Sequence, residues 1–229
     1  MKQILNQLRL IPHRPLVAVM AVCVLVFLVD EVIDPDLGFI YGARPIEFQA
    51  GWQAITNGKV TAEAFELLAR LLAPLFLHGG LDHILGNMVF LWAFGSLVSR
   101  LVGNWWALAL FLVCGALGNV TQICMEPGSF IPIIGASGGV AGLEGVYLGL
   151  TLRWTLPWPD VFPLAHPVPP GQLAIFAAIG IGWDLYSVAS ATGAGVAYGA
   201  HLGGFASGLA FALLITSVFG SPEAWRRKR

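Results

Sequence analysis

Charged side chains are scarce in this chain of 229 residues: 11% are Asp, Glu, Lys or Arg, whereas 57% are hydrophobic. A soluble globular domain ordinarily carries about 25% charged residues, so this composition excludes an ordinary soluble protein. The mean hydropathy of +0.76 points the same way. We therefore expect a polytopic protein embedded in the lipid bilayer, with too little polar sequence for a second sizeable soluble domain.

An excess of one charge is also lacking, since the formal net charge is −1. Without a basic patch beyond the two termini, nothing is available to neutralise a phosphate backbone, which argues against nucleic acid as a partner. The three cysteines are odd in number and lie within or at the ends of apolar runs. We expect them to fill space as small apolar residues rather than to form a disulfide.

Long apolar runs predict six membrane-spanning helices, because a helix needs roughly 20 mostly apolar residues to cross the hydrocarbon. The expected fold class is therefore all-α, a bundle of six transmembrane helices. The first run follows three basic residues as a signal peptide would, but no clear small-residue cleavage site follows it closely, so we interpret it as a span. The runs lie near residues 15–33, 82–100, 104–125, 133–152, 171–190 and 196–218.

The basic residues predict the orientation of these spans. Six spans leave both termini on one side, and most of the 12 Lys and Arg residues fall on that side. We therefore expect cytoplasmic termini, with a cytoplasmic segment 1–14, a six-span domain 15–218 and a basic tail 219–229. Arg44, Lys59 and Arg70 fall opposite, while Lys2, Arg9, Arg14, Arg100, Arg153, Arg226, Arg227, Lys228 and Arg229 fall with the termini.

The connection 34–81 is too long to be an idle turn, and it lies on the outer side in this orientation. Thr61 is a plausible N-cap for an amphipathic helix within it. Such a helix lies in the membrane interface or caps the bundle, and the pattern allows both. The loop from Trp154 to Gly171 is rich in proline and aromatic residues, which excludes a helix interior; its His166 is assigned no role. The apolar stripe of the outer helix consists of Phe65, Leu68, Leu71, Leu72 and Leu75, opposite Glu63, Glu66 and Arg70.

Polar side chains gather near the outer ends of spans two, four and six. His78 precedes the second span, and His83 and Asn87 share one face of it because they are four residues apart. Ser137 lies among glycines in the fourth span, and His201 lies among glycines in the sixth. Since a helix rises about 1.5 Å per residue, these groups occupy a similar depth. Polar groups in a bilayer are costly, so each is a candidate for function.

Glycines at spacings of three and four explain how two of these groups would meet. Such stripes allow two helices to pack backbone to backbone. A serine on one helix and a histidine on the other then reach hydrogen-bond distance, the geometry of nucleophilic catalysis. Packing alone would account for either residue singly, but less readily for the set at one depth. The fourth span has Gly135, Gly138, Gly142, Gly145 and Gly149, and the last has Gly199, Gly203, Gly204 and Gly208, with Ser207 between.

Two other chemistries were weighed against a serine nucleophile. A metal site from His78, His83 and His201 is disfavoured because the first two do not share a helix face and no HExxH motif occurs, so we expect neither metal nor cofactor. Glu144 and Asp184 are buried acids or parts of a proton path. Neither is well placed to complete a triad, Glu144 being too deep, so we expect a Ser–His dyad without a carboxylate.

Three motifs together resemble those of the rhomboid intramembrane serine proteases. They are Gly135-Ala136-Ser137-Gly138, the series His78, His83 and Asn87-Met88, and Ala200-His201 followed by Gly204 and Gly208. They occur in the family's order on spans two, four and six. The resemblance covers nearly the whole chain, from about residue 15 to 218, and implies the six-span rhomboid fold. It also implies an integral membrane protein, expected in a bacterial inner membrane, that cleaves single-span membrane protein substrates.

The resemblance implies a role for each motif residue. Ser137 would be the nucleophile and His201 its general base and acid, while His83, Asn87 and the Ser137 N–H would hold the oxyanion. His78 would help to shape or hydrate the site, and Gly135 would let the substrate backbone approach. Two positions depart from the family's pattern. Ala69 replaces the tryptophan of the outer Trp-Arg pair that Arg70 matches, and Ala141 replaces a tyrosine that stacks on the histidine in some bacterial members.

Two other functions remain open from the sequence. A non-catalytic relative would bind membrane helices without cutting them, although such relatives typically lack the serine or the histidine. A transporter or channel for protons or small solutes would use Glu144, Asp184 and His201 as a relay. No inverted repeat is visible to support transport.

Overall fold

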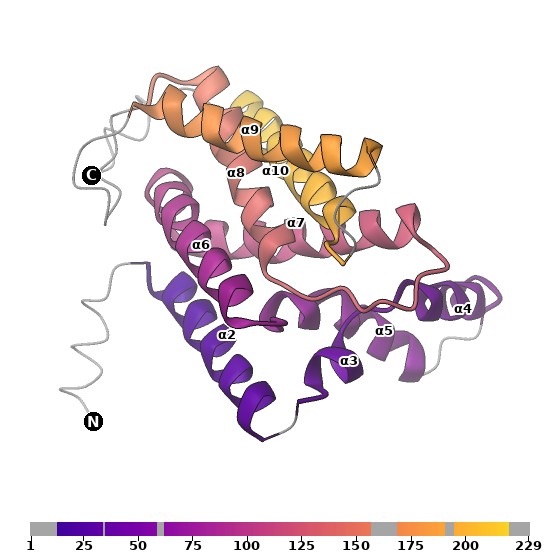
Figure 1. The fold of residues 1–229 in the computed structure, drawn as a ribbon. Coiled ribbons are helices and arrows are strands. Elements are labelled where there is room, and N and C mark those ends of the chain that lie inside the picture. The colour runs from indigo at the N-terminus through magenta and orange to yellow at the C-terminus, as the bar shows by residue number, and fades with distance from the viewer. Residues whose placement is uncertain (1–12, 34, 59–61, 157–168, 191–194, 220–229) are drawn as a thin grey trace.

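The computed structural model describes residues 13–33, 35–58, 62–156, 169–190 and 195–219. Within these ranges the regular elements are helices, apart from one isolated antiparallel β-bridge between Ala43 and Ile133. The expected all-α class is therefore confirmed. The long helices, drawn in Figure 1, are α2 (Arg14–Val32), α6 (Leu81–Val102), α7 (Asn104–Met125), α8 (Ser137–Arg153), α9 (Pro170–Ala189) and α10 (Tyr198–Phe219).

Four of the described helices are long and apolar enough to cross a membrane: α2, α6, α7 and α9. Residues 198–214 of α10 form a shorter apolar helix, and α8 has 17 residues. The protein is thus a polytopic membrane protein. That it has six spans is still a prediction. The expected tail 219–229 and the segment 1–14 lie almost wholly outside the described residues, as do Thr61 and His166.

Five of the six predicted runs match helices to within two residues at each end, but the fourth begins later than predicted. It was expected at 133, whereas α8 begins at Ser137. Ile133 is instead extended and bonds to Ala43 through both its N–H and its carbonyl. Gly135 has φ of +119°, which helical backbone cannot adopt. The segment before Ser137 is therefore a bonded loop, and the serine is the first residue of its helix.

Helix α8 lies at the centre of the bundle and contacts α6, α7, α9 and α10. Its glycine stripe packs against α10 as predicted. A Cβ on Gly208 would overlap the carbonyl oxygen of Gly142, and a Cβ on Gly145 would overlap the carbonyl oxygen of Phe205. The other stripe of α10 faces α7 instead, where Gly199 N–H donates to Gln122 Oε1 at 2.7 Å. The glycines thus hold three helices at backbone distance.

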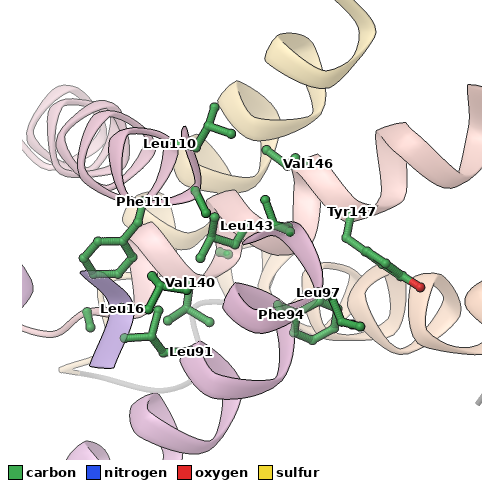
Figure 2. Packing of buried hydrophobic residues seen from close by; sticks show 14 of the residues in the cluster. Leu16, Leu91, Phe94, Leu97, Leu110, Phe111, Val140, Leu143, Val146 and Tyr147 are labelled. Atoms are coloured by element: carbon green, nitrogen blue, oxygen red, sulfur yellow. The ribbon is translucent and has the colours of Figure 1, made fainter. Parts of the chain in front are cut away.

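Larger side chains fill the opposite side of α8, as Figure 2 shows. Leu143, Val146 and Tyr147 pack with Phe111 of α7 and with residues of α6. The Tyr147 ring meets Phe94 edge to face, with 6.0 Å between centroids. This face therefore holds α6 and α7 against α8 by apolar burial, while the glycine face holds α10.

Four short helices between α2 and α6 lie together beside one end of the bundle (Figure 1). The amphipathic helix predicted within 34–81 corresponds to α5, while its placement on the outer side stays a prediction. Helix α4 was not predicted, although Pro45 and Glu47 in its first turn are typical start signals. Asn119 Nδ2 of α7 donates to the Leu71 carbonyl at 2.8 Å and so ties α5 to the bundle. The four are α3 (Leu37–Tyr41), α4 (Pro45–Thr56), α5 (Ala62–Leu72) and the 3₁₀ helix η1 (Ala73–Phe76).

Arg70 is anchored despite the alanine at position 69. Its Nη1 lies 2.6 Å from Glu47 Oε2 in α4, and its Nη2 lies 3.0 Å from Glu66 Oε1 in α5. Arg44 binds the other oxygen of Glu47 at 2.6 Å. Glu47 therefore joins two arginines and holds α4 against α5.

Candidate active site

Ser137 stands at the N-terminus of α8, facing a cavity. The first intrahelical bond runs from Val140 N–H to the Ala136 carbonyl at 3.0 Å, so the N–H groups of residues 137–139 precede the hydrogen-bond ladder. Such groups carry the positive end of the helix dipole. The Ser137 hydroxyl and the backbone N–H groups of residues 137–139 therefore lie together at the start of α8.

His201, in the first turn of α10, meets this serine. Its Nε2 lies 2.8 Å from Ser137 Oγ. The contact depends on the close approach of the two helices, since a Cβ on Gly138 would stand 3.2 Å from the Ala200 carbonyl oxygen. The sequence predicted that these two residues meet, and the structure brings them together.

A carboxylate also contacts this histidine, which the sequence reasoning excluded. Asp184 Oδ2 of α9 lies 2.9 Å from His201 Nδ1. The expectation of a Ser–His pair without a carboxylate is therefore wrong for the geometry of the site. The sequence does not specify the rotation of α9 about its axis, and that rotation turns the Asp184 carboxylate toward α10. Glu144 lines the same cavity one helix away.

His83 faces the serine from α6. Its Nδ1 accepts the Gly79 N–H at 3.3 Å, so in the neutral ring the proton resides on Nε2. A Cβ at Gly135 would lie 2.7 Å from that Nε2 and 3.5 Å from Ser137 Oγ. Gly135 therefore leaves space between a histidine donor and the hydroxyl, and its N–H is held by the Pro74 carbonyl at 2.9 Å.

Asn87 lines the cavity one turn below His83. Its Nδ2 donates to the His83 carbonyl at 2.9 Å. An amide nitrogen carries two hydrogens, so one remains for a group bound in the cavity. The side chain is nearly buried, and its bond to the helix fixes its orientation.

His78 stands behind His83 rather than in the cavity lining. Its ring is fully buried and meets the His83 ring edge to face, with 5.2 Å between centroids. Burial lowers the pKa of His78 to about 4, with the neighbouring His83 as a smaller cause. His78 is therefore neutral at physiological pH and supports the His83 ring by packing.

The cavity has a volume of about 940 Å³. It is lined by residues of α6, α8, α9 and the start of α10, so the serine is accessible from between α6 and α9. The lining combines acidic and imidazole side chains with apolar side chains such as Phe90 of α6 and Ile179 and Trp183 of α9. A segment with an apolar surface and one reactive polar bond would suit this lining.

The ring of His201 has a second neighbour that sequence reasoning did not name. Tyr198 meets it edge to face, with 6.2 Å between centroids at 84°. Its position three residues before His201, on the same face of α10, was the available signal. Ala141 lines the cavity with its small side chain. Asp184 and Tyr198 are thus both in contact with this imidazole.

Comparison with known proteins gives a family match. A model described as the Rhomboid domain matches residues 66–218, which includes α6 to α10 and the whole cavity. The chain is 35% identical over 83 residues to "Putative rhomboid protease YdcA" of Bacillus subtilis, covering 36% of this chain and 41% of that protein. It is likewise 35% identical over 83 residues to "Rhomboid protease GluP" of the same species, covering 36% and 16%.

A plant protein matches a longer segment. "RHOMBOID-like protein 4" of Arabidopsis thaliana is 32% identical over 154 residues, covering 66% of this chain and 35% of that protein. The matched segments span less than half the length of each of these relatives.

Proposed function

This chain belongs to the rhomboid family, and from that premise we propose that it is an intramembrane serine endopeptidase that cleaves single-span membrane proteins. The observation that carries the proposal is the 2.8 Å contact between Ser137 Oγ and His201 Nε2 within an accessible cavity. Two of the matched relatives bear the name rhomboid protease. The chemistry that follows is derived from this chain's own residues.

In the first step Ser137 Oγ attacks the carbonyl carbon of a substrate peptide bond. The hydroxyl proton passes to His201 Nε2 as the new C–O bond forms, and the carbonyl π electrons move to oxygen. His201 then returns that proton to the leaving nitrogen as the C–N bond breaks. The product is an acyl-enzyme ester at Ser137 and a free amine.

Three donors are placed to bind the developing oxyanion. They are His83 Nε2–H, the second Nδ2 hydrogen of Asn87 and the Ser137 backbone N–H at the positive end of α8. Donors fixed in advance lower the barrier because no reorganisation is needed when the charge forms. Gly135 keeps the space beside them open for the substrate backbone.

In the second step water attacks the ester. His201 takes a proton from the water, the C–O bond to Ser137 breaks, and the proton returns to Ser137 Oγ. The carboxylic acid product then leaves, and the site is restored. Water reaches Ser137 through the cavity from the end of the bundle where α6 and α10 begin, which is the outer face if both termini are cytoplasmic.

The substrate class follows from the lining of the cavity. Apolar side chains of α6 and α9 in the cavity lining suit a membrane helix, and Ser137 and His201 line the same cavity. A helical peptide bond has its carbonyl engaged in the helix ladder. Cleavage therefore favours sites near the outer end of the substrate helix, where Gly or Pro weakens the ladder.

The test is cleavage of a model single-span substrate in liposomes. We expect Ser137→Ala to abolish cleavage and to prevent labelling by a fluorophosphonate. Ser99→Ala serves as the matched control, because Ser99 is buried in α6 and does not line the cavity. Cleavage that persists in Ser137→Ala would refute the proposal. An intact wild-type protein that neither cleaves nor labels would instead favour a non-catalytic binder of membrane helices.

A further inference from the structure

We propose that Asp184 is a positioning residue for His201, so that this protein uses a Ser–His–Asp arrangement in place of a two-residue site. The inference rests on the proposed function, since it assigns a role toward the same histidine. It is carried by the 2.9 Å contact between Asp184 Oδ2 and His201 Nδ1. The three side chains come from α8, α9 and α10 and form one continuous chain of contacts.

The contacts determine which ring nitrogen holds the proton. An ionised carboxylate only accepts hydrogen bonds, so Nδ1 must carry the hydrogen that lies between it and Asp184. Imidazole binds a proton more tightly than a carboxylate does, which also places the hydrogen on the ring. Nε2 then presents its lone pair to the Ser137 hydroxyl. The opposite tautomer would direct an N–H at the serine and could not accept its proton.

The packing contacts of the His201 ring do not determine which of its nitrogens is protonated. Ala141 has no ring to stack on His201, and Tyr198 meets the imidazole only edge to face. An edge contact restrains the ring plane but does not distinguish its two nitrogens, whereas a hydrogen bond at Nδ1 does. The hydrogen bond to Asp184 therefore selects the tautomer protonated at Nδ1, which the packing contacts do not select.

Partial burial makes the contact effective. The Asp184 side chain is 14% exposed and that of His201 is 21% exposed. Little bulk water competes for Nδ1 in such a position, and a fixed negative charge there stabilises the imidazolium that forms when Ser137 gives up its proton. Glu144 lines the same cavity, whereas the carboxylate that contacts His201 is that of Asp184, so Glu144 provides a comparison at a carboxyl group without this contact.

The first experiment separates positioning from general electrostatics. We expect Asp184→Asn to lower kcat on the order of 10²-fold, less than the roughly 10⁴-fold loss in soluble triads because the site is only partly buried. KM should change by less than about threefold, since Asp184 acts through His201. The rate of fluorophosphonate labelling should fall with kcat. Ser187→Ala, a buried polar position one turn further along α9, controls for disturbance of the helix.

Glu144→Gln provides the comparison at a second carboxyl group of the cavity. We expect it to lower kcat much less than Asp184→Asn, and Asp184→Glu to recover part of the activity. If Glu144→Gln and Asp184→Asn reduce kcat equally, the effect is not specific to the contact with His201 and the proposal is overturned. It is also overturned if folded Asp184→Asn keeps wild-type kcat and labelling rate.

The second experiment needs no turnover. Nitrogen NMR of the histidine-labelled protein in detergent, with His201 assigned by its loss in His201→Gln, reports which nitrogen is protonated. We expect protonated Nδ1 in the wild type and a changed tautomer balance in Asp184→Asn. Protonation at Nε2 in the wild type would overturn this inference even if the protein cleaves. Absence of cleavage with Nδ1 protonated would refute the proposed function and leave the assignment of Asp184 as the partner of His201 standing.

Discussion

Gly204 of α10 packs directly against the carbonyl oxygen of Gly138 in α8, so closely that a Cβ on Gly204 would overlap that oxygen. This contact lies one residue from Ser137 and three from His201. Because both partners are backbone, neither can turn aside as a side chain would. The distance between Ser137 Oγ and His201 Nε2 therefore depends on residue 204 having no Cβ.

Gly204→Ala should separate α8 from α10. The backbone must move to admit the Cβ, and we expect destabilisation of about 3 kcal/mol or more together with loss of cleavage. Thermal unfolding in detergent and the model-substrate assay measure the two effects. Gly182→Ala is the control, since its Cβ would meet nothing within 4 Å and Gly182 is exposed on α9. Equal stability of the two variants would contradict the role of the glycine contact.

Gly135→Ala should impair the site more than the fold. At φ of +119° an alanine is strained, at a cost of about 1–3 kcal/mol, and its Cβ would lie 2.7 Å from His83 Nε2. We expect kcat to fall at least about tenfold as His83 is displaced from the oxyanion position. Gly128→Ala, in the same loop with open space around it, should cleave normally. Wild-type kcat in Gly135→Ala would exclude His83 as an oxyanion donor.

Glu47→Gln should loosen the outer helices without disabling the chemistry. Glu47 joins α4 to α5 through Arg70, whereas the Glu66–Arg70 pair lies within α5. These side chains are partly exposed, so we expect a loss of about 1 kcal/mol or less. Hydrogen exchange of α4 should rise more in Glu47→Gln than in Glu66→Gln. The reverse order would mean that the contact between α4 and α5 depends on something other than Glu47.

The contact between Ser137 and His201 was predictable because the two features that produce it can be read from the sequence. Helix rise fixes depth, and glycine spacing indicates where two backbones approach. The start of α8 was not predictable in the same way. An apolar run extends through Ile133, and only the pairing of that residue with Ala43, 90 positions earlier, makes it extended.

Asp184 was misjudged for a related reason. Most of α9 is apolar on all sides, so its sequence has little periodicity from which to infer the face that Asp184 occupies. The anchoring of Arg70 by Glu47 was missed because α4 itself was not predicted. In each case the deciding partner belongs to an element distant in sequence, whose rotation or position no local pattern specifies.

Helix α9 both bounds the cavity and carries Asp184, and it is the more exposed of the two walls: 22% of its most apolar 18-residue stretch is buried, against 56% in α6. It packs mainly against α8 and α10. A bulky helix that enters between α6 and α9 by displacing α9 would therefore lengthen the bond between Asp184 and His201. The Asp184 carboxylate would thus link the position of α9 to the orientation of the imidazole.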